Sequence, residues 1–215
     1  MLPANLQRRS LHTALVLIFL VSGSAQATPV FYFDEASFLA AASTAGIGLS
    51  TEGFVGATDL GSTINFATGS ASAASSISVD FRGTDGDGAA IGWSAAGNSS
   101  PLTWVLNDAQ NAFGIDVQDC CEINPFEINM SVNSVDHRFG FGSAQGELNL
   151  QFIGVIDTML AFTTLTMTAP QGDFHIFDRL QTGTGTATAV PEPSTLVLFG
   201  AGLFGLGLAR RRRLV

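Results

Sequence analysis

Between residues 28 and 181 the chain is a succession of short apolar or alternating runs, interrupted by Gly, Ser, Asn and Asp. Alternation with a period of two places neighbouring side chains on opposite faces of a strand, and the interrupting residues favour turns. Many short strands joined by turns favour a sandwich or barrel over a parallel α/β sheet. The runs that we interpret as strands are Val30–Phe33, Ser76–Phe81, Leu102–Leu106, Ala112–Val117, Glu127–Val132, Glu147–Ile153, Leu160–Thr168 and Asp173–Leu180.

One helix is expected near the start of this all-β body. Asp34 can cap its N-terminus, Phe38, Leu39 and Ala42 follow at helical spacing, and Gly46 can end it. The glycine-rich segment 83–98 predicts a long surface loop.

The charge of the body limits its partners. The 215 residues allow one ordinary domain with attached signals. Between residues 28 and 190 three arginines stand against 17 of the 18 carboxylates, which gives a net charge near −14. Such a body repels phosphate backbones, so we expect no nucleic-acid partner.

The N-terminal 27 residues have the layout of a secretory signal peptide. Arg8 and Arg9 precede an apolar run, Leu11–Val21, and the small residues Ala25 and Ala27 mark a cleavage site after Ala27. As a helix, this apolar run would span only about 16 Å, too little for a bilayer core of ~30 Å. The mature chain is therefore expected to begin at Thr28, outside the cytoplasm.

The C-terminal end has the layout of a membrane tether. Pro191, Glu192 and Pro193 precede an apolar, glycine-broken segment, 194–209, and a cluster of four arginines, Arg210, Arg211, Arg212 and Arg213. A helix over 194–209 would measure about 24 Å, at the short limit for a span, and the arginines would stop it on the cytoplasmic side. We expect a C-terminal transmembrane helix over these residues, with the body outside.

This C-terminal pattern resembles the PEP-CTERM sorting signal, also known as an ice-binding protein C-terminal domain. The resemblance covers residues 190–215 and implies recognition and cleavage near Pro191–Pro193 by exosortase, a transpeptidase of the membrane. It also implies release to the cell surface and association with exopolysaccharide and biofilm matrix. The expected layout is a signal peptide at 1–27, a sandwich at 28–181, a flexible Thr/Gly spacer at 182–189 and the sorting signal at 190–215.

The body more weakly resembles secreted PEP-CTERM ectodomains with a lectin-like jelly-roll character. The features that carry this resemblance are Thr51–Phe54, Ala112–Val117, Phe152–Ile156 and Phe177–Leu180. It implies a single jelly-roll-like sandwich, and by analogy with such modules a structural Ca²⁺ with Glu52 and Asp178 as oxygen ligands. The alternative is that both carboxylates face solvent or pair with Arg179.

The two tryptophans differ in their surroundings. Trp104 lies in an apolar strand and is expected in the core, whereas Trp93 lies beside the glycine-rich segment. Because stacking on a sugar requires a flat exposed aromatic ring, Trp93 is the candidate ligand contact.

Cys120 and Cys121 are adjacent, so their pairing has three open solutions. A strained vicinal disulfide ranks first, ahead of two free thiols and an intermolecular bridge, because export favours oxidation. The flanking Asp119 and Glu122 would raise the thiol pKa values and argue against a reactive nucleophile.

No catalytic constellation is evident in the sequence. The mature chain has two histidines, His137 and His175, without a nucleophile elbow or zinc-type spacing. The first hypothesis is a non-enzymatic surface or matrix protein processed by exosortase. The second is a carbohydrate-binding module, with or without calcium. The third is a hydrolase that uses paired carboxylates, which sequence alone does not exclude.

Overall fold

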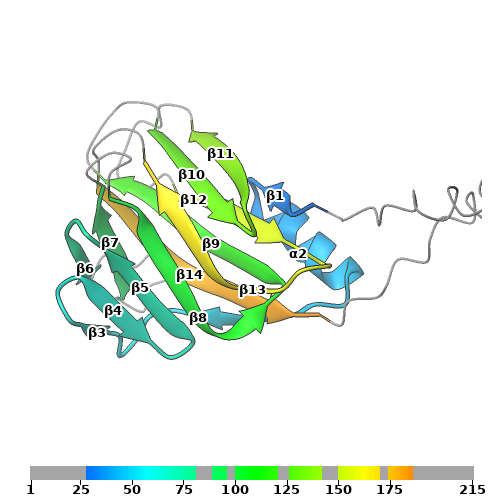
Figure 1. The fold of residues 1–215 in the computed structure, drawn as a ribbon, viewed down its shortest axis with the longest axis horizontal. Helices are drawn as coiled ribbons and strands as arrows, with labels where there is room; N and C mark the ends of the chain where they lie inside the picture. Colours follow the sequence, from blue (N-terminus) through cyan, green and yellow to red (C-terminus); the bar gives the residue numbers. More distant parts are fainter. Residues whose placement is uncertain are drawn as a thin grey trace, which may run out of the picture.

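The computed structural model describes residues 28–80, 89–95, 100–120, 126–141, 150–169 and 174–185, which form two layers of strands and one helix (Figure 1). The pairings are antiparallel throughout the described strands. The expected all-β sandwich with a short N-terminal helix is confirmed at this level.

The first layer, sheet A, has seven strands with β14 near its centre. Its order is β1 (Val30–Tyr32), β12 (Leu150–Ile156), β9 (Ala112–Cys120), β14 (Phe174–Thr184), β7 (Ala90–Ser94) and β6 (Ile77–Asp80), and β2 (Gly48–Glu52) also pairs with β14.

The second layer, sheet B, also has seven strands. Its order is β11 (Val135–Phe141), β10 (Phe126–Val132), β13 (Phe162–Thr168), β8 (Leu102–Gln110), β5 (Gly69–Ala73), β4 (Thr63–Phe66) and β3 (Thr58–Asp59).

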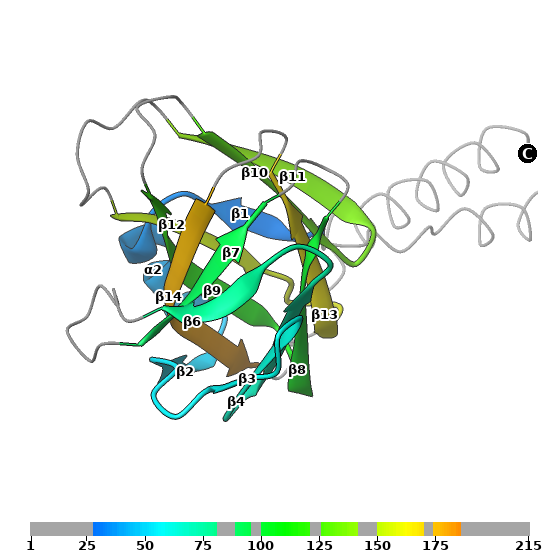
Figure 2. The same cartoon turned by 90° about the vertical axis from the view of Figure 1, so that its left-hand side faces the viewer.

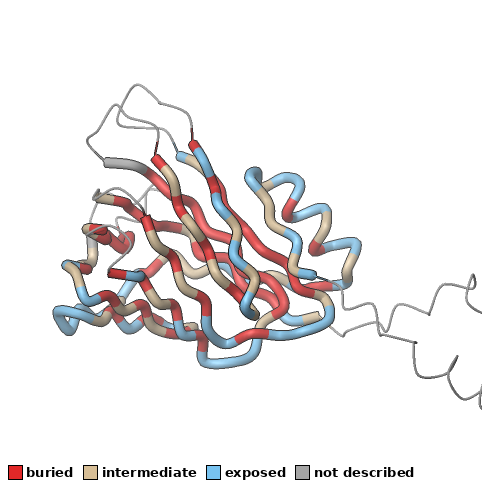
Figure 3. The backbone as a smooth tube through the Cα atoms, turned by 45° about the horizontal axis from the view of Figure 1, so that its top comes forward, coloured by how far each residue is buried: buried red, intermediate tan, exposed pale blue. Residues whose placement is uncertain are grey.

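The main core lies between the two sheets and is rich in aromatic rings. Trp104 of β8 has no exposed surface, which confirms its predicted core position. Its ring meets Phe113 of β9 and Phe177 of β14 edge-on, at centroid distances of 5.6 and 5.8 Å. Such contacts between the layers hold the sandwich together, because edge-to-face aromatic pairs add to the burial of apolar area. Figure 3 shows buried residues along the strands.

The helix α2 (Glu35–Thr44) covers part of the outer face of sheet A. Asp34 caps it, since its Oδ1 accepts a hydrogen bond from the Ser37 amide at 2.8 Å. Phe38 and Ala42 are buried against sheet A, whereas Leu39, although at helical spacing with them, is 43% exposed. Figure 2 shows α2 beside β12 and β14, on the side away from β8 and β13.

Two predicted loop segments belong to the sheets instead. Residues 90–94, inside the expected loop 83–98, form β7 and pair with both β6 and β14. Residues 182–184, expected at the start of the spacer, are the end of β14 and pair with β2. Both segments are rich in small residues, and pairing with long neighbouring strands outweighs their weak intrinsic strand propensity.

The two ends of the chain lie outside the described residues. This applies to the signal peptide, to its cleavage residues Ala25 and Ala27, and to the expected transmembrane helix at 194–209. Among the residues that the structure describes, no helix is long and apolar enough to cross a membrane.

Candidate functional site

The outer face of sheet B is lined by short polar side chains. In β10 the residues alternate between buried and half-buried along the whole strand, so that Asn129 and Ser131 point away from the core. In β13 Thr166 and Thr168 are half-buried, with the buried Met167 between them. This alternation follows from the pleat of a strand that has the core on one side only.

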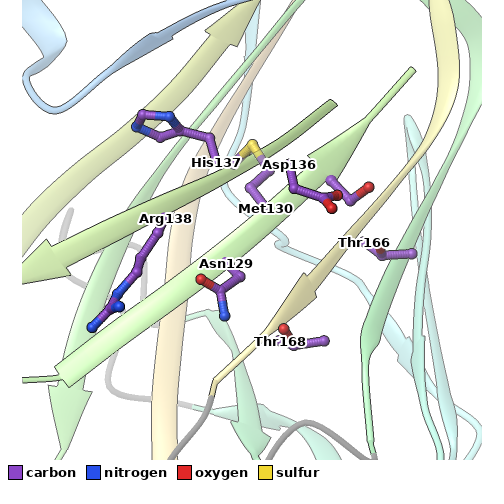
Figure 4. A pocket seen from close by; sticks show the side chains of 8 residues that line it. Asn129, Met130, Asp136, His137, Arg138, Thr166 and Thr168 are labelled. Atoms are coloured by element: carbon purple, nitrogen blue, oxygen red, sulfur yellow. The ribbon is translucent and has the colours of Figure 1, made fainter. Parts of the chain in front are cut away.

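A cavity of about 450 Å³ lies on this face, over β10, β11 and β13. Figure 4 shows Asn129, Arg138 and Thr168 on one side of the strands and the His137 ring on the other. The residues that line the cavity are Asn129, Met130, Ser131, Asp136, His137, Arg138, Thr166 and Thr168. We call this cavity the β10 pocket.

Strand register brings the polar residues of the β10 pocket into two rows. Arg138, Asn129 and Thr168 occupy one row across β11, β10 and β13. Asp136, Ser131 and Thr166 occupy the next row. Directly opposed side chains in a sheet lie about 4.5–5.5 Å apart at Cβ, so each row forms a compact set of donors and acceptors.

The two charged residues that line the β10 pocket have opposite signs, and its rim adds one more carboxylate. Asp136 carries one negative charge and Arg138 one positive charge, and the amide and hydroxyls of the other polar residues are neutral. Arg138 also forms an ion pair with Glu127 at the rim of the pocket. The site therefore offers hydrogen bonds in several directions without a strong net charge, which suits a neutral polyol better than an ion.

His137 belongs to the core side of β11. Its ring stacks on Phe31 with a centroid distance of 4.5 Å and meets Phe139 edge-on at 4.9 Å. Burial lowers the pKa of His137 below its ordinary value of 6.5, because the charged form loses hydration there. Its buried Nε2 has no hydrogen-bond partner among the described residues. The imidazole therefore faces the aromatic core and is poorly placed to serve as a base in the pocket.

A second polar cluster lies on the outer face of sheet A, around Arg179. The Arg179 Nε donates to Asp116 Oδ2 at 2.5 Å, and its Nη2 donates to Glu35 Oε2 at 3.0 Å. Gln181 donates to the other oxygen of Glu35. The cluster ties the first turn of α2 to β9 and β14.

The backbone at Arg179 explains how β14 presents this cluster. The register of β14 against β9 shifts between Asp178 and Gln181, and Arg179 has a φ of 49°. An extra residue in one strand forms a β-bulge, which redirects the side chain of the bulged residue. Here the bulge points the guanidinium along the outer face, where it reaches carboxylates far away in the sequence.

The Arg179 cluster is not an open catalytic pair. Asp116 is 3% exposed and Asp178 has no exposed surface. Burial raises the pKa of Asp116, and the hydrogen bond from Arg179 opposes that rise. The same bond is the main cause that raises the pKa of Arg179. A substrate cannot reach Asp116 or Asp178, and the partly exposed Glu35 already accepts from Arg179 and Gln181, so the cluster has the form of a structural ion-pair network.

Trp93, the predicted sugar contact, is fully buried. Its Nε1 donates to Ser75 Oγ at 3.2 Å, and its ring lies against those of His175 and Phe177. A ring without an exposed face cannot stack on a sugar, so the expectation that Trp93 is an exposed aromatic is wrong. The cause is β7, which carries Trp93 into the core of the sandwich.

The predicted calcium ligands lie on paired strands. Glu52 ends β2 opposite Leu180, two residues beyond Asp178 in β14. Glu52 Oε1 accepts from the Phe54 amide, and Asp178 Oδ1 accepts from the Arg179 amide. Among the described residues no three His, Cys, Asp or Glu side chains form a group that could hold a metal ion. Ca²⁺ takes six to eight oxygens, so Glu52 and Asp178 would supply only part of such a site. Calcium binding stays a prediction, which melting with added calcium and with a chelator tests.

The other predicted site residues are placed only in part. Cys120 is the last residue of β9, and its side chain is not described. Cys121, the sorting residues Pro191, Glu192 and Pro193, and the cluster Arg210, Arg211, Arg212 and Arg213 lie outside the described residues.

The β10 pocket was not predicted from the sequence, although a signal for it existed. Residues 126–132 alternate strictly between apolar and polar side chains, and 162–168 contain four threonines. These features predict outward polar faces for two strands. They do not predict that β10 and β13 are neighbours with Asn129 opposite Thr168, which needs the strand order.

Comparison with known families identifies the C-terminal segment. The PEP-CTERM protein-sorting motif matches residues 189–213, which confirms the resemblance seen in the sequence. The motif implies export and sorting by exosortase, and a sorting segment associated with the membrane. No curated protein matches the chain.

Several solved structures are similar to the body in outline only. A variant of the family 29 carbohydrate-binding module CBM29-2 covers 68% of this chain and 99% of its own, at 12% identity and a TM-score of 0.39. The xylan-binding domain of CBM 22 covers 66% and 96%, at 10% identity and a TM-score of 0.40. An exo-β-1,3-galactanase from Phanerochaete chrysosporium shares 14% identity, covering 55% of this chain and 30% of its own, with a TM-score of 0.36. At these scores the similarity carries no argument about the ligand of this chain.

Proposed function

We propose that this chain is an exported, non-enzymatic protein of the cell surface or extracellular matrix, which a C-terminal helix tethers until exosortase processes it. The sorting motif at 189–213 is the observation that carries this proposal. The described residues end at 185, directly after β14, and the sorting motif begins four residues later in the sequence, at 189.

Mass spectrometry of the protein from the outer fraction tests the processing step. The expected result is a mature chain that begins at Thr28 and ends near Pro191–Pro193. A Glu192→Ala variant should accumulate in the membrane fraction with its C-terminus intact. An outer-fraction protein that still contains Arg210–Arg213 would refute processing.

A second candidate function is carbohydrate binding, which the β10 pocket favours. Sugars present many hydroxyls that both donate and accept, and the pocket faces them with an amide, three hydroxyls and one charge of each sign. The acidic body would repel anionic polymers at long range, so the pocket suits a neutral sugar. Exopolysaccharide is a partner that such a site could hold at the cell surface.

Glycan-array binding followed by calorimetry tests this second function. Thr168→Val removes one hydroxyl from the pocket and keeps the β-branched shape that a strand favours. The loss of one hydrogen bond should weaken binding about fivefold. Thr51→Val, the same change on an exposed position of β2 in sheet A, should leave affinity unchanged. Equal loss in both variants, or no glycan bound at all, would contradict the pocket as the site.

A carboxylate-based hydrolase is a weaker proposal. It requires two acids facing each other across an open cleft. Asp116 and Asp178 are opposed in β9 and β14, but both are buried. A release assay for reducing sugar on the polysaccharides that bind would detect this activity.

A further inference from the structure

The outer face of sheet B carries a row of hydroxyl side chains that extends well beyond the β10 pocket. Ser131 pairs with Thr166, Thr166 with Thr103, Thr103 with Ser72, and Ser72 with Thr63. The row therefore crosses β10, β13, β8, β5 and β4 without interruption. We call these five residues the hydroxyl row.

The residues of the hydroxyl row are partly exposed, and within the described residues their hydroxyl groups make no hydrogen bond. All five residues are half-buried, and all but Thr63 stand between two buried neighbours that face the core. Among the described residues none of the five side chains has a hydrogen-bond partner. Opposed hydroxyls in a sheet can bond one another, but in this structure the hydroxyls of the row do not. Their donors and acceptors are left to solvent or to a ligand.

The surface along the row carries no charged side chain except Asp136 at one end. Asp136 stands at the end of the row next to Ser131, and the five hydroxyl positions carry no charge. The neighbouring row across β13, β8, β5 and β4 consists of Thr164, Val105, Ser70 and Asn65, which are also uncharged. On a body with a net charge near −14, an uncharged band of this length is a distinct surface.

These properties select one class of ligand. A protein partner would use large apolar or aromatic anchors, but Val105 is the one exposed large hydrophobic residue among these two rows. An anionic polymer meets repulsion from the body. Neighbouring strands are spaced by about 4.8 Å, so the five residues of the row span about 19 Å. The distance from one hydroxyl of the row to the next is therefore similar to the length of one sugar unit in an extended chain.

We propose that an extended, neutral polysaccharide lies across the strands of sheet B, with one end in the β10 pocket and successive sugar units over the hydroxyl row. This inference rests on the proposed carbohydrate-binding function and adds the ligand's extended form, its neutrality and its direction. Each sugar unit beyond the pocket gains contacts with the next strand, so affinity rises with chain length.

Calorimetry with linear disaccharides and hexasaccharides of glucose, xylose and mannose tests the proposal on the full exported chain. For the sugar that binds, the hexasaccharide should bind at least tenfold more tightly than the disaccharide of the same sugar. Thr103→Val, two strands away from β10, should weaken the hexasaccharide about fivefold and leave the disaccharide unchanged. Thr168→Val should weaken both sugars, and Thr51→Val neither.

The outcomes separate the two proposals. Equal affinity for both lengths, or a hexasaccharide affinity that Thr103→Val does not change, overturns the row and leaves the pocket as a sugar site. Absence of binding to every neutral sugar overturns both. Tighter binding of an anionic polymer than of any neutral one overturns the charge argument. Ser72→Ala replaces Thr103→Val if the latter variant melts below the parent protein.

Discussion

Gly114 and Gly154 leave space for aromatic rings beneath helix α2, and filling that space should destabilise the protein. The two glycines are opposed in β9 and β12. A Cβ at position 114 would lie 2.6 Å from the Phe152 Cζ and 3.0 Å from the Phe38 ring. Phe38 has no exposed surface and its ring lies 5.2 Å from that of Phe152, so neither ring can withdraw without moving the helix.

Gly114→Ala should therefore cost about 2 kcal/mol of unfolding free energy, within the usual range for overpacking. For a body of this size that corresponds to a fall in Tm of about 4–8 °C. Gly140→Ala is the control, because it lies in β11 with no atom within 4 Å of its added Cβ. Both changes reduce the freedom of the unfolded chain equally, so the control should melt at or slightly above the parent protein.

Thermal and urea unfolding, followed by circular dichroism, measure the difference. Shortening the opposing ring by Phe152→Leu should lower the cost of Gly114→Ala, so the double variant should be less destabilised than the sum of the two single changes. If Gly114→Ala melts like Gly140→Ala, or if the two changes are simply additive, the packing of α2 on these glycines is not as described.

Three further results are expected. Arg179→Met leaves the buried Asp116 without its ion pair and should lower the free energy of unfolding by about 2 kcal/mol, less than for a fully buried pair because Arg179 is 31% exposed. Glu35→Gln should lower it by under about 1 kcal/mol. Urea unfolding that ranks the two variants in reverse would contradict the network. Burial lowers the pKa of His137, so the unfolded chain binds the proton more readily, and stability should fall as pH drops below about 6.5. His137→Phe should lose that pH dependence. Identical pH profiles of the variant and the parent protein would refute this role of His137. Both tryptophans have no exposed surface, so their fluorescence should resist iodide quenching until the protein unfolds, and free quenching in the native state would contradict their burial.

The strand content and the helix cap could be predicted because their signals are local. Asp34 lies directly before the helix that it caps, and the alternation of 126–132 shows which side chains leave the core. The position of Trp93 could not be predicted in this way. A glycine-rich neighbourhood is typical of a loop, but pairing with β6 and β14 makes residues 90–94 a buried strand.

The candidate site illustrates the same division. Each strand predicts its own outward residues, so Thr103 and Thr166 are foreseeable as polar surface positions. Their alignment depends on a register between β8 and β13, strands that lie some sixty residues apart, and a shift of one residue would turn every hydroxyl toward the core.

The sequence by itself determined the all-β class of the body, the capped helix and the sorting motif at 189–213, since each depends on residues close together in the chain. The tertiary structure alone decided that Trp93 is buried, that Arg179 meets Asp116 and Glu35, and that five hydroxyls form one row. The physical reason is that strand order and register join distant residues, and these are fixed by how the two sheets pack on a common core.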